Sequence, residues 1–167
     1  MKILVVYYSL TGHTKGIAEA IADECGADIE QIKDIKRREG AFVMFWSGRE
    51  ALLKRPGLIQ PSEIEPAQYD LVILGTPVWA WALSSPMRAY ITQHSSSLTW
   101  VAFFCTEGGS GGKRAFRQMS DLIGKQPVAT LEITETDLKT GADGDKLTPF
   151  TKAIAQLAGG TDARAHT

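Results

Sequence analysis

The sequence predicts an α/β protein in which helices cover both faces of a doubly wound parallel sheet of five strands. Short apolar runs alternate along the chain with stretches of helical periodicity, and this order requires crossover connections between parallel strands. The chain has 167 residues, 44% of them hydrophobic, which suits one domain with one core. We expect residues 1–160 to form this domain and residues 161–167 to be a frayed tail.

The first predicted strand is Lys2–Tyr8, whose apolar run lacks alternation and is typical of a strand buried on both faces. A helix follows from Thr14, because apolar residues recur at helical spacing until Gly26 ends the pattern. The weakly alternating stretch Ala27–Ile35 predicts a second strand near a sheet edge. The run Tyr69–Pro77 predicts a third, buried strand, which we expect to stop at its closing Gly-Thr-Pro.

The second half of the chain continues this alternation. Ser85–His94 begins with a serine cap and a proline, as many helices do. Thr99–Gly109 predicts a fourth strand that runs into glycines. Three elements complete the chain: a helix at Lys113–Ile123, an alternating edge strand at Ala129–Thr136 and a last helix at Asp145–Ala158.

One stretch, Ile35–Pro66, is too long for a plain crossover. Its apolar residues could form one or two short helices. They are Phe42, Val43, Phe45, Trp46, Leu52 and Leu53. Two interpretations are open: a helix that covers the sheet, or an aromatic wall beside a pocket or a subunit contact. If segment 42–46 is exposed, we expect a homodimer through it.

Composition argues against several classes of partner. Eighteen basic and nineteen acidic residues give a net charge of −1, so there is no electrostatic basis for binding nucleic acid. No apolar run reaches the roughly 20 residues that span a bilayer, and no small-residue cleavage site follows the first strand. We therefore expect no membrane partner. Cys25 and Cys105 do not form a CxxC pair, so we expect neither a disulfide nor a metal site, and a cytoplasmic location.

The turn SLTGHT, residues 9–14, places three hydroxyl side chains and a glycine between the first strand and the first helix. A helix start exposes unpaired N–H groups and the positive end of the helix dipole, which together suit an anion. One hydroxyl would be enough to cap the helix. Ser9, Thr11 and Thr14 together with Gly12 therefore favour a bound phosphate, although the turn lacks the GxGxxG of dinucleotide sites and the GK[ST] of P-loops.

With this turn the sequence resembles the flavodoxin family, whose phosphate loop reads Ser/Thr-x-Thr-Gly-x-Thr directly after the first strand. SLTGHT matches every fixed position, and the resemblance extends over nearly the whole chain. It implies the strand order 2-1-3-4-5. In that order the loops 9–14, 76–81 and 105–112 converge beyond the carboxyl ends of the strands, where open parallel sheets bind ligands. It also implies that the phosphate of FMN is held by Ser9, Thr11, Gly12, His13 and Thr14.

The second loop contains two tryptophans, and each can bury up to about 250 Å² of surface. By resemblance, Trp79 stacks on the flavin and Trp81 flanks it. The open alternative is that one of them only packs beneath the loop. The cofactor contacts expected from this loop are Thr76, Pro77, Val78, Trp79, Ala80 and Trp81.

The third loop has four glycines in five residues, which would let backbone N–H groups reach the pyrimidine edge of the ring. Glu107 either contacts the ring edge or the ribityl chain, or is a solvated loop carboxylate. Cys105 lies in an apolar strand context that does not favour a nucleophile. The cofactor contacts expected here are Thr106, Glu107, Gly108, Gly109 and Gly111.

The sequence departs from the family pattern in three ways. Electron-carrying flavodoxins are usually strongly acidic, whereas this chain has a net charge of −1. Ala80 and Ala82 occur where the family commonly has a glycine beside the flavin N5, and alanine adopts positive φ less readily. The third loop lacks the stacking tyrosine of the family, so we expect one flavin face to be open to a quinone or a nicotinamide.

We therefore expect an FMN-binding redox protein: either an electron carrier with a redox partner protein, or a small reductase that uses a quinone or NAD(P)H. The flavin supplies the chemistry, so we assign no catalytic residue. The alternative is a doubly wound domain without this cofactor that binds a phosphorylated metabolite in the turn. Trp79 and the glycine loop argue against it, because a phosphate alone needs neither.

Overall fold

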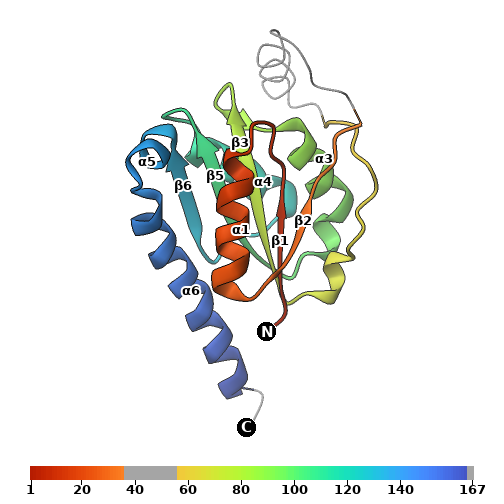
Figure 1. Cartoon of the computed structure of the whole chain (residues 1–167). Coiled ribbons are helices and arrows are strands. Elements are labelled where there is room, and N and C mark those ends of the chain that lie inside the picture. The colour runs from red at the N-terminus through yellow and green to blue at the C-terminus, as the bar shows by residue number, and fades with distance from the viewer. Residues whose placement is uncertain (36–55, 165–167) are drawn as a thin grey trace.

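The computed structural model describes residues 1–35 and 56–164, and segments 36–55 and 165–167 lie outside this description. Five parallel strands are arranged in the order β2-β1-β3-β5-β6 (Figure 1), which confirms the predicted order 2-1-3-4-5. Their bounds are β1 Ile3–Tyr7, β2 Asp28–Gln31, β3 Leu71–Trp79, β5 Trp100–Glu107 and β6 Thr130–Thr134. Segment 42–46 is not among the described residues, so a homodimer through it stays a prediction.

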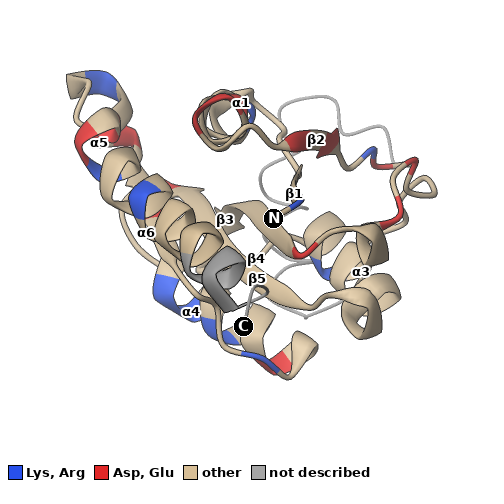
Figure 2. Ribbon diagram, turned by 90° about the horizontal axis from the view of Figure 1, so that it is seen from below, with Lys and Arg blue, Asp and Glu red and all other residues tan. Residues whose placement is uncertain are grey.

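Helices cover both faces of the sheet, as Figure 2 shows from below. α1 and α6 pack on one face through one apolar cluster, and α3 and α4 pack on the other through a second cluster. Strand side chains alternate between the two clusters, with Leu71 and Ile73 of β3 in one and Val72 and Leu74 in the other. The helix bounds are α1 His13–Cys25, α3 Ser85–His94, α4 Gly112–Ile123 and α6 Asp143–Arg164. Because both faces are covered, the central strands are mostly apolar, and their polar residues Thr76, Thr106 and Glu107 lie toward the carboxyl ends.

The prediction that the third strand stops at Gly75 and Pro77 is wrong, because β3 continues to Trp79. β1 pairs with β3 only as far as Gly75, whereas β5 continues to pair with it up to Pro77. Beyond Gly75, β3 therefore has β5 alone as a parallel neighbour among the described strands. Proline has no N–H to donate to a neighbouring strand, and it is tolerated where a strand has a neighbour on one side only.

Several shorter elements were not predicted. β4 (Ala82–Leu83) is a sixth strand that returns antiparallel along the end of β3. α5 (Glu135–Thr140) begins within the stretch predicted as the end of the last strand. Two 3₁₀ turns occupy Pro66–Gln68 and Ser95–Ser97.

Two helix boundaries also differ from the prediction. The cap of α3 is Ser84 rather than Ser85, and the Ser84 hydroxyl hydrogen-bonds the Thr76 hydroxyl (2.9 Å) instead of the helix backbone. α6 begins at Asp143 and extends to Arg164, beyond the predicted end at Ala158. For residues 165–167 fraying stays a prediction.

Across the described ranges, no helix has both the length and the apolar character that a bilayer span would need. Cys25 and Cys105 are both free, which agrees with the expectation that they form no disulfide. The cytoplasmic location stays a prediction.

Candidate functional site

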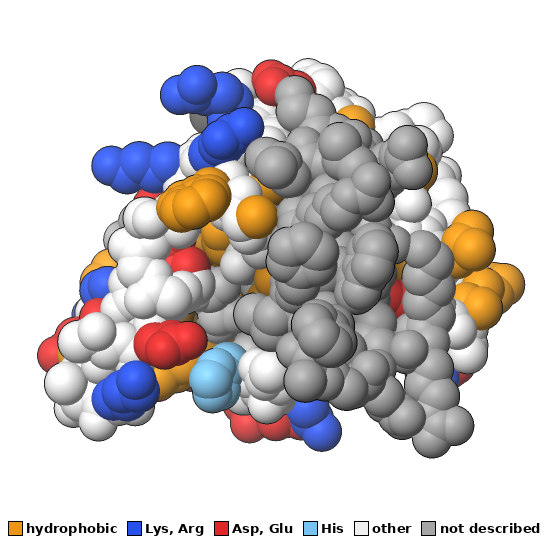
Figure 3. Space-filling view, turned by 90° about the horizontal axis from the view of Figure 1, so that it is seen from above, with side chains coloured by type: hydrophobic (Ala, Val, Ile, Leu, Met, Phe, Trp, Pro, Cys, Tyr) orange, Lys and Arg blue, Asp and Glu red, His pale blue; other side chains and the backbone are white. Residues whose placement is uncertain are grey.

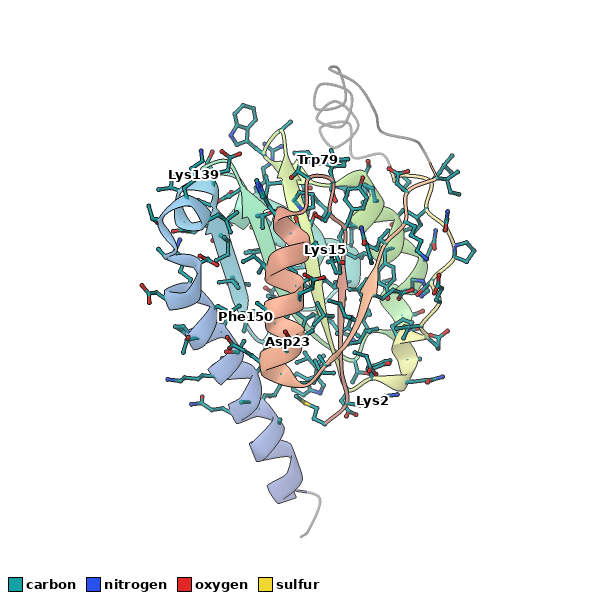
Figure 4. All side chains as sticks on the ribbon, viewed as in Figure 1. Lys2, Lys15, Asp23, Trp79, Lys139 and Phe150 are labelled. Carbon is teal, nitrogen blue, oxygen red and sulfur yellow. The ribbon has the colours of Figure 1, made fainter. Side chains whose placement is uncertain are left out.

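A cavity of about 180 Å³ lies beyond the carboxyl ends of β1, β3 and β5. All three predicted loops border it, and α5 forms a fourth wall. In Figure 4, Trp79 and Lys139 of α5 lie at this end of the molecule, and Lys2 lies at the opposite end. The lining residues are Leu10, Thr11, His13, Pro77, Val78, Trp79, Thr106, Glu107, Gly108, Glu135 and Leu138.

Half of the predicted site residues line this cavity, and the other half lie in the same loops but outside its wall. Those outside are Ser9, Gly12, Thr14, Thr76, Ala80, Trp81, Gly109 and Gly111. All of them except Gly109 have side-chain hydrogen bonds or positive φ angles that shape the loops. No cluster of His, Cys, Asp and Glu in the described part of the chain could hold a metal ion.

The first loop leaves the N-terminus of α1 without a side-chain cap. Gly12 is the N-cap residue, with a φ of 94°, and the first turn of the helix contains no acidic residue. The Ser9 hydroxyl accepts a hydrogen bond from the Gly12 N–H (3.1 Å) and so closes the loop on itself. The N–H groups of the first turn have no partner within the helix. An anion placed there would gain these donors and the helix dipole.

A buried pair of hydroxyls joins the first loop to the third. Thr14 Oγ1 lies 2.7 Å from Thr106 Oγ1, although the two residues are 92 positions apart. Thr14 is buried, and Thr106 lines the cavity. In such a pair one hydroxyl donates to the other, so the second hydroxyl keeps a proton for another acceptor. The pair therefore fixes the relative position of the two loops and leaves one donor available.

The second predicted loop is a tight hairpin rather than an open loop. Trp79 pairs with Ala82, and only Ala80 and Trp81 lie between them. Both have positive φ, 47° and 58°, as a type I′ turn requires. This conformation costs a non-glycine residue about 1–2 kcal/mol. Ala80 therefore adopts positive φ although alanine does so less readily than glycine, because the hairpin imposes it.

The two tryptophans of the hairpin have different environments. Trp79 is only 4% exposed, and its ring meets the Tyr8 ring edge to face with centroids 5.5 Å apart. Trp79 also lines the cavity, so it is both a core residue and a wall residue. Trp81 is 61% exposed, and its indole N–H donates to the Ser110 hydroxyl (3.1 Å).

The structure contradicts one of the two roles that were open for Glu107, and contact with the flavin stays a prediction, since Glu107 lines the cavity. Its side chain is buried, and Oε2 accepts a hydrogen bond from the N–H of Gly112, the first residue of α4 (2.7 Å). It is therefore not a solvated carboxylate, and one of its oxygens is committed to holding the glycine loop closed. Burial raises the pKa of the neighbouring Cys105 thiol, which agrees with an inert cysteine.

Gly111 lets the third loop approach the hairpin closely. Its φ of 116° is accessible to few residues other than glycine. A Cβ atom there would lie 2.8 Å from Val78 Cγ1 and 2.9 Å from Trp81 Cα. The second and third loops therefore pack as one unit beside the cavity.

Sequence reasoning missed Leu10, Glu135 and Leu138, which also line the cavity. Glu135 and Leu138 belong to α5, whose start is fixed by a capping box between Thr134 and Asp137. The pattern Thr-Glu-Thr-Asp at 134–137 is a readable signal for such a helix start. Strand alternation up to Thr136 masked it.

Asp137 stabilises the start of α5, which borders the cavity, and this stabilisation depends on pH. The hydrogen bond from Lys146, together with those from the Thr134 N–H and hydroxyl, lowers the pKa of this carboxyl from its ordinary 3.8 to about 2. A lowered pKa means that the carboxylate stabilises the fold above about pH 4 and that this contribution is lost as the pH falls toward about 2.

We therefore expect Asp137→Asn to lower the urea midpoint at pH 7, and the gap to the unmutated protein to narrow as the pH falls below about 4. Denaturation followed by circular dichroism at several pH values would measure this gap. Asp121→Asn, which removes an exposed carboxylate from α4, is the matched control. If the difference in urea midpoint between Asp137→Asn and the unmutated protein stayed constant across this pH range, the lowered pKa of Asp137 would not be its cause.

A family model described as flavodoxin matches residues 2–142, a range that contains all three loops. Two solved structures share the fold. One is a flavoprotein from Lactobacillus acidophilus in complex with FMN, with a TM-score of 0.69 and 24% identity, over 83% of this chain and 97% of that chain. The other is the oxidised flavodoxin 1 of Bacillus cereus, with a TM-score of 0.57 and 18% identity, over 93% of this chain and 98% of that chain.

A curated relative also matches part of the chain. An NAD(P)H dehydrogenase (quinone) from Cupriavidus metallidurans is 33% identical over 96 residues, which are 55% of this chain. These residues cover 46% of that protein, so the chain spans about half the length of this relative.

Proposed function

The chain belongs to the flavodoxin family, and we propose that it binds FMN in the cavity beyond β1, β3 and β5 and acts as a redox protein. Bound FMN would supply the electron-transfer chemistry, while the protein sets its orientation and access. One observation carries the proposal. An uncapped helix start, suited to a phosphate, opens beside a cavity that has an aromatic wall.

The first loop fits the phosphate end of FMN. We assign the phosphate to the N–H groups of the first turn of α1 and to the hydroxyl of Thr11. Thr11 and His13 are exposed and line the cavity, so both could reach an anion there. Ser9, Gly12 and Thr14 would act indirectly, because their hydrogen bonds fix the shape of the loop that surrounds the phosphate.

The remaining walls fit the ring system. Trp79, Val78, Leu10 and Leu138 supply apolar surface from three separate elements, as flat aromatic ligands require. Thr106 supplies a hydroxyl, and Gly108 offers backbone that a ring edge can approach closely. These groups bind and orient the ring and exclude water from one side of it.

Two kinds of reaction partner are candidates for this site: small molecules and a redox protein. The partial match to an NAD(P)H dehydrogenase (quinone) supports a reductase that exchanges electrons with a nicotinamide and a quinone. The near-neutral charge agrees with small-molecule partners, because such a surface steers charged proteins only weakly overall. An electron carrier is the second candidate, favoured by the exposed Trp81 beside the site.

The first test is titration of the cofactor-free protein with FMN and, separately, with riboflavin, followed by flavin fluorescence. We expect the fluorescence of FMN to be quenched when it binds. Riboflavin, which lacks the phosphate, should bind more weakly. Stepwise photoreduction of the same sample without air would then separate one-electron from two-electron chemistry by the absorbance spectrum. Absence of quenching with both flavins would overturn the proposal and favour a phosphorylated metabolite in the turn.

A further inference from the structure

Three cations form a patch on α4. Lys113, Arg114 and Arg117 are exposed, and none of them forms an ion pair with a carboxylate in the part of the chain that the structure describes. Figure 2 shows basic residues along α4, and Figure 3 shows basic side chains gathered at one edge of the face that carries the loops. The patch is local, because the whole chain has a net charge of −1.

Helix stability does not explain this placement. Lys113 and Arg114 are the second and third residues of α4, and the first turn contains no acidic residue. Cations are unfavourable there, because the helix dipole places partial positive charge at this end. The Glu107 carboxylate on the Gly112 N–H offsets part of this charge, but among the described residues it forms no ion pair with Lys113 or Arg114. α5 has the opposite and favourable arrangement, with Glu135 and Asp137 in its first turn. The cations of α4 therefore point to a partner outside the fold.

An exposed aromatic residue lies beside these cations. The Trp81 indole is held by the Ser110 hydroxyl, and the Trp81 backbone packs against Gly111, directly before α4 begins. A tryptophan that is 61% exposed, in a backbone conformation unfavourable to it, has no evident role in the core. Tryptophan and arginine are also the residues most enriched at the energetic centres of protein interfaces.

We propose that the basic face, formed by Trp81, Lys113, Arg114 and Arg117, is the docking surface for an acidic redox protein. This inference rests on the proposed function, because a redox partner must dock near the cofactor. The hairpin that carries Trp81 also supplies Val78 and Trp79 to the cavity wall, so a partner on the basic face would lie next to the site. Charge complementarity requires that the docking surface of the partner carry negative charge.

The arrangement of the cations favours a protein over a small anion. The three side chains are exposed and spread along more than one helical turn. They do not converge on a buried point, as the donors of a small-anion site do. Exposed charges of this kind steer a protein surface to its docking orientation and raise the association rate.

The test measures binding of a small [2Fe–2S] ferredoxin with an acidic surface to the FMN-loaded protein, at low and at moderate ionic strength. We expect the double variant Lys113→Gln/Arg114→Gln to bind about tenfold more weakly at low salt and to lose most of the salt dependence. The control Lys33→Gln/Lys152→Gln removes the same charge from distant exposed positions and should bind as the unmutated protein does. FMN affinity should be equal in all three proteins.

Three results would overturn the proposal: no salt-dependent binding of the ferredoxin, equal loss in both double variants, or displacement of the ferredoxin by NADPH, which would assign the patch to a small anion. Basic cytochrome c should not bind to this face. Failure of the proposed function is separate, because it would appear as absence of FMN binding in the unmutated protein before any ferredoxin is added.

Discussion

Replacing Gly75 with alanine is expected to lower the free energy of unfolding by about 3 kcal/mol, the upper end of the usual cost of overpacking a core. Gly75 lies in β3 between Tyr7 of β1 and Phe104 of β5. A Cβ atom at this position would lie 2.0 Å from Phe104 Cζ and 2.3 Å from Cε1. Real side chains never approach so closely, and the Phe104 ring is fully buried and cannot swing into solvent.

Urea denaturation followed by circular dichroism would measure this loss. The double variant Gly75→Ala/Phe104→Leu should recover part of it, because leucine removes the ring atoms that the new methyl group meets. Gly16→Ala is the matched control: Gly16 is the fourth residue of α1 and an added Cβ there meets nothing within 4 Å, so alanine should stabilise the helix by about 0.4–1 kcal/mol. A double variant as unstable as the sum of its parts would show that the Phe104 ring is not the obstacle.

The Gly75–Phe104 contact illustrates which parts of the fold sequence could predict. The three central strands follow from runs of apolar residues that must be buried on both faces, and the two edge strands follow from alternating patterns. The contact itself is not readable from sequence, because it joins residues of different strands in a register that the sequence pattern leaves open. Gly75 was interpreted as part of the end of the third strand, whereas in the structure it lies inside β3 and makes room for the Phe104 ring.

The hairpin was missed for a related reason. Type I′ turns are usually signalled by Asn-Gly or Asp-Gly, and this turn is Ala80-Trp81. Its positive φ values are imposed by pairing of β3 with β4 and by packing against Gly111, both of which are tertiary effects. Local propensity therefore pointed to an irregular loop where tertiary contacts make an ordered one.

The candidate site shows the same division. The positions of the three loops were predicted from the carboxyl-end rule and are confirmed, since residues from each line one cavity. The roles of individual side chains within the loops could be predicted less well from the sequence. Glu107 is committed to the N–H of Gly112, and Thr14 is committed to Thr106. These are contacts that only the folded arrangement of the loops creates.

Those contacts single out Thr11 as the residue that tests phosphate binding most cleanly. The hydroxyls of Ser9 and Thr14 both make hydrogen bonds within the fold, so removing either would disturb the loop as well as a ligand. Thr11 is exposed and lines the cavity. Valine keeps its shape and removes only the hydroxyl, so we expect Thr11→Val to leave the free energy of unfolding nearly unchanged.

If Thr11 donates to the FMN phosphate, Thr11→Val should weaken FMN binding by about 1.5–3 kcal/mol, the usual contribution of a hydrogen bond to a charged group. This corresponds to a dissociation constant roughly 10 to 150 times higher, measured by fluorescence quenching. Thr11→Ser, which keeps the hydroxyl, should retain most of the affinity. Riboflavin has no phosphate, so its binding should be the same in all three proteins. An equal loss for FMN and riboflavin would mean that Thr11 acts on the ring or on the loop, and the phosphate would then have to lie elsewhere than at the start of α1.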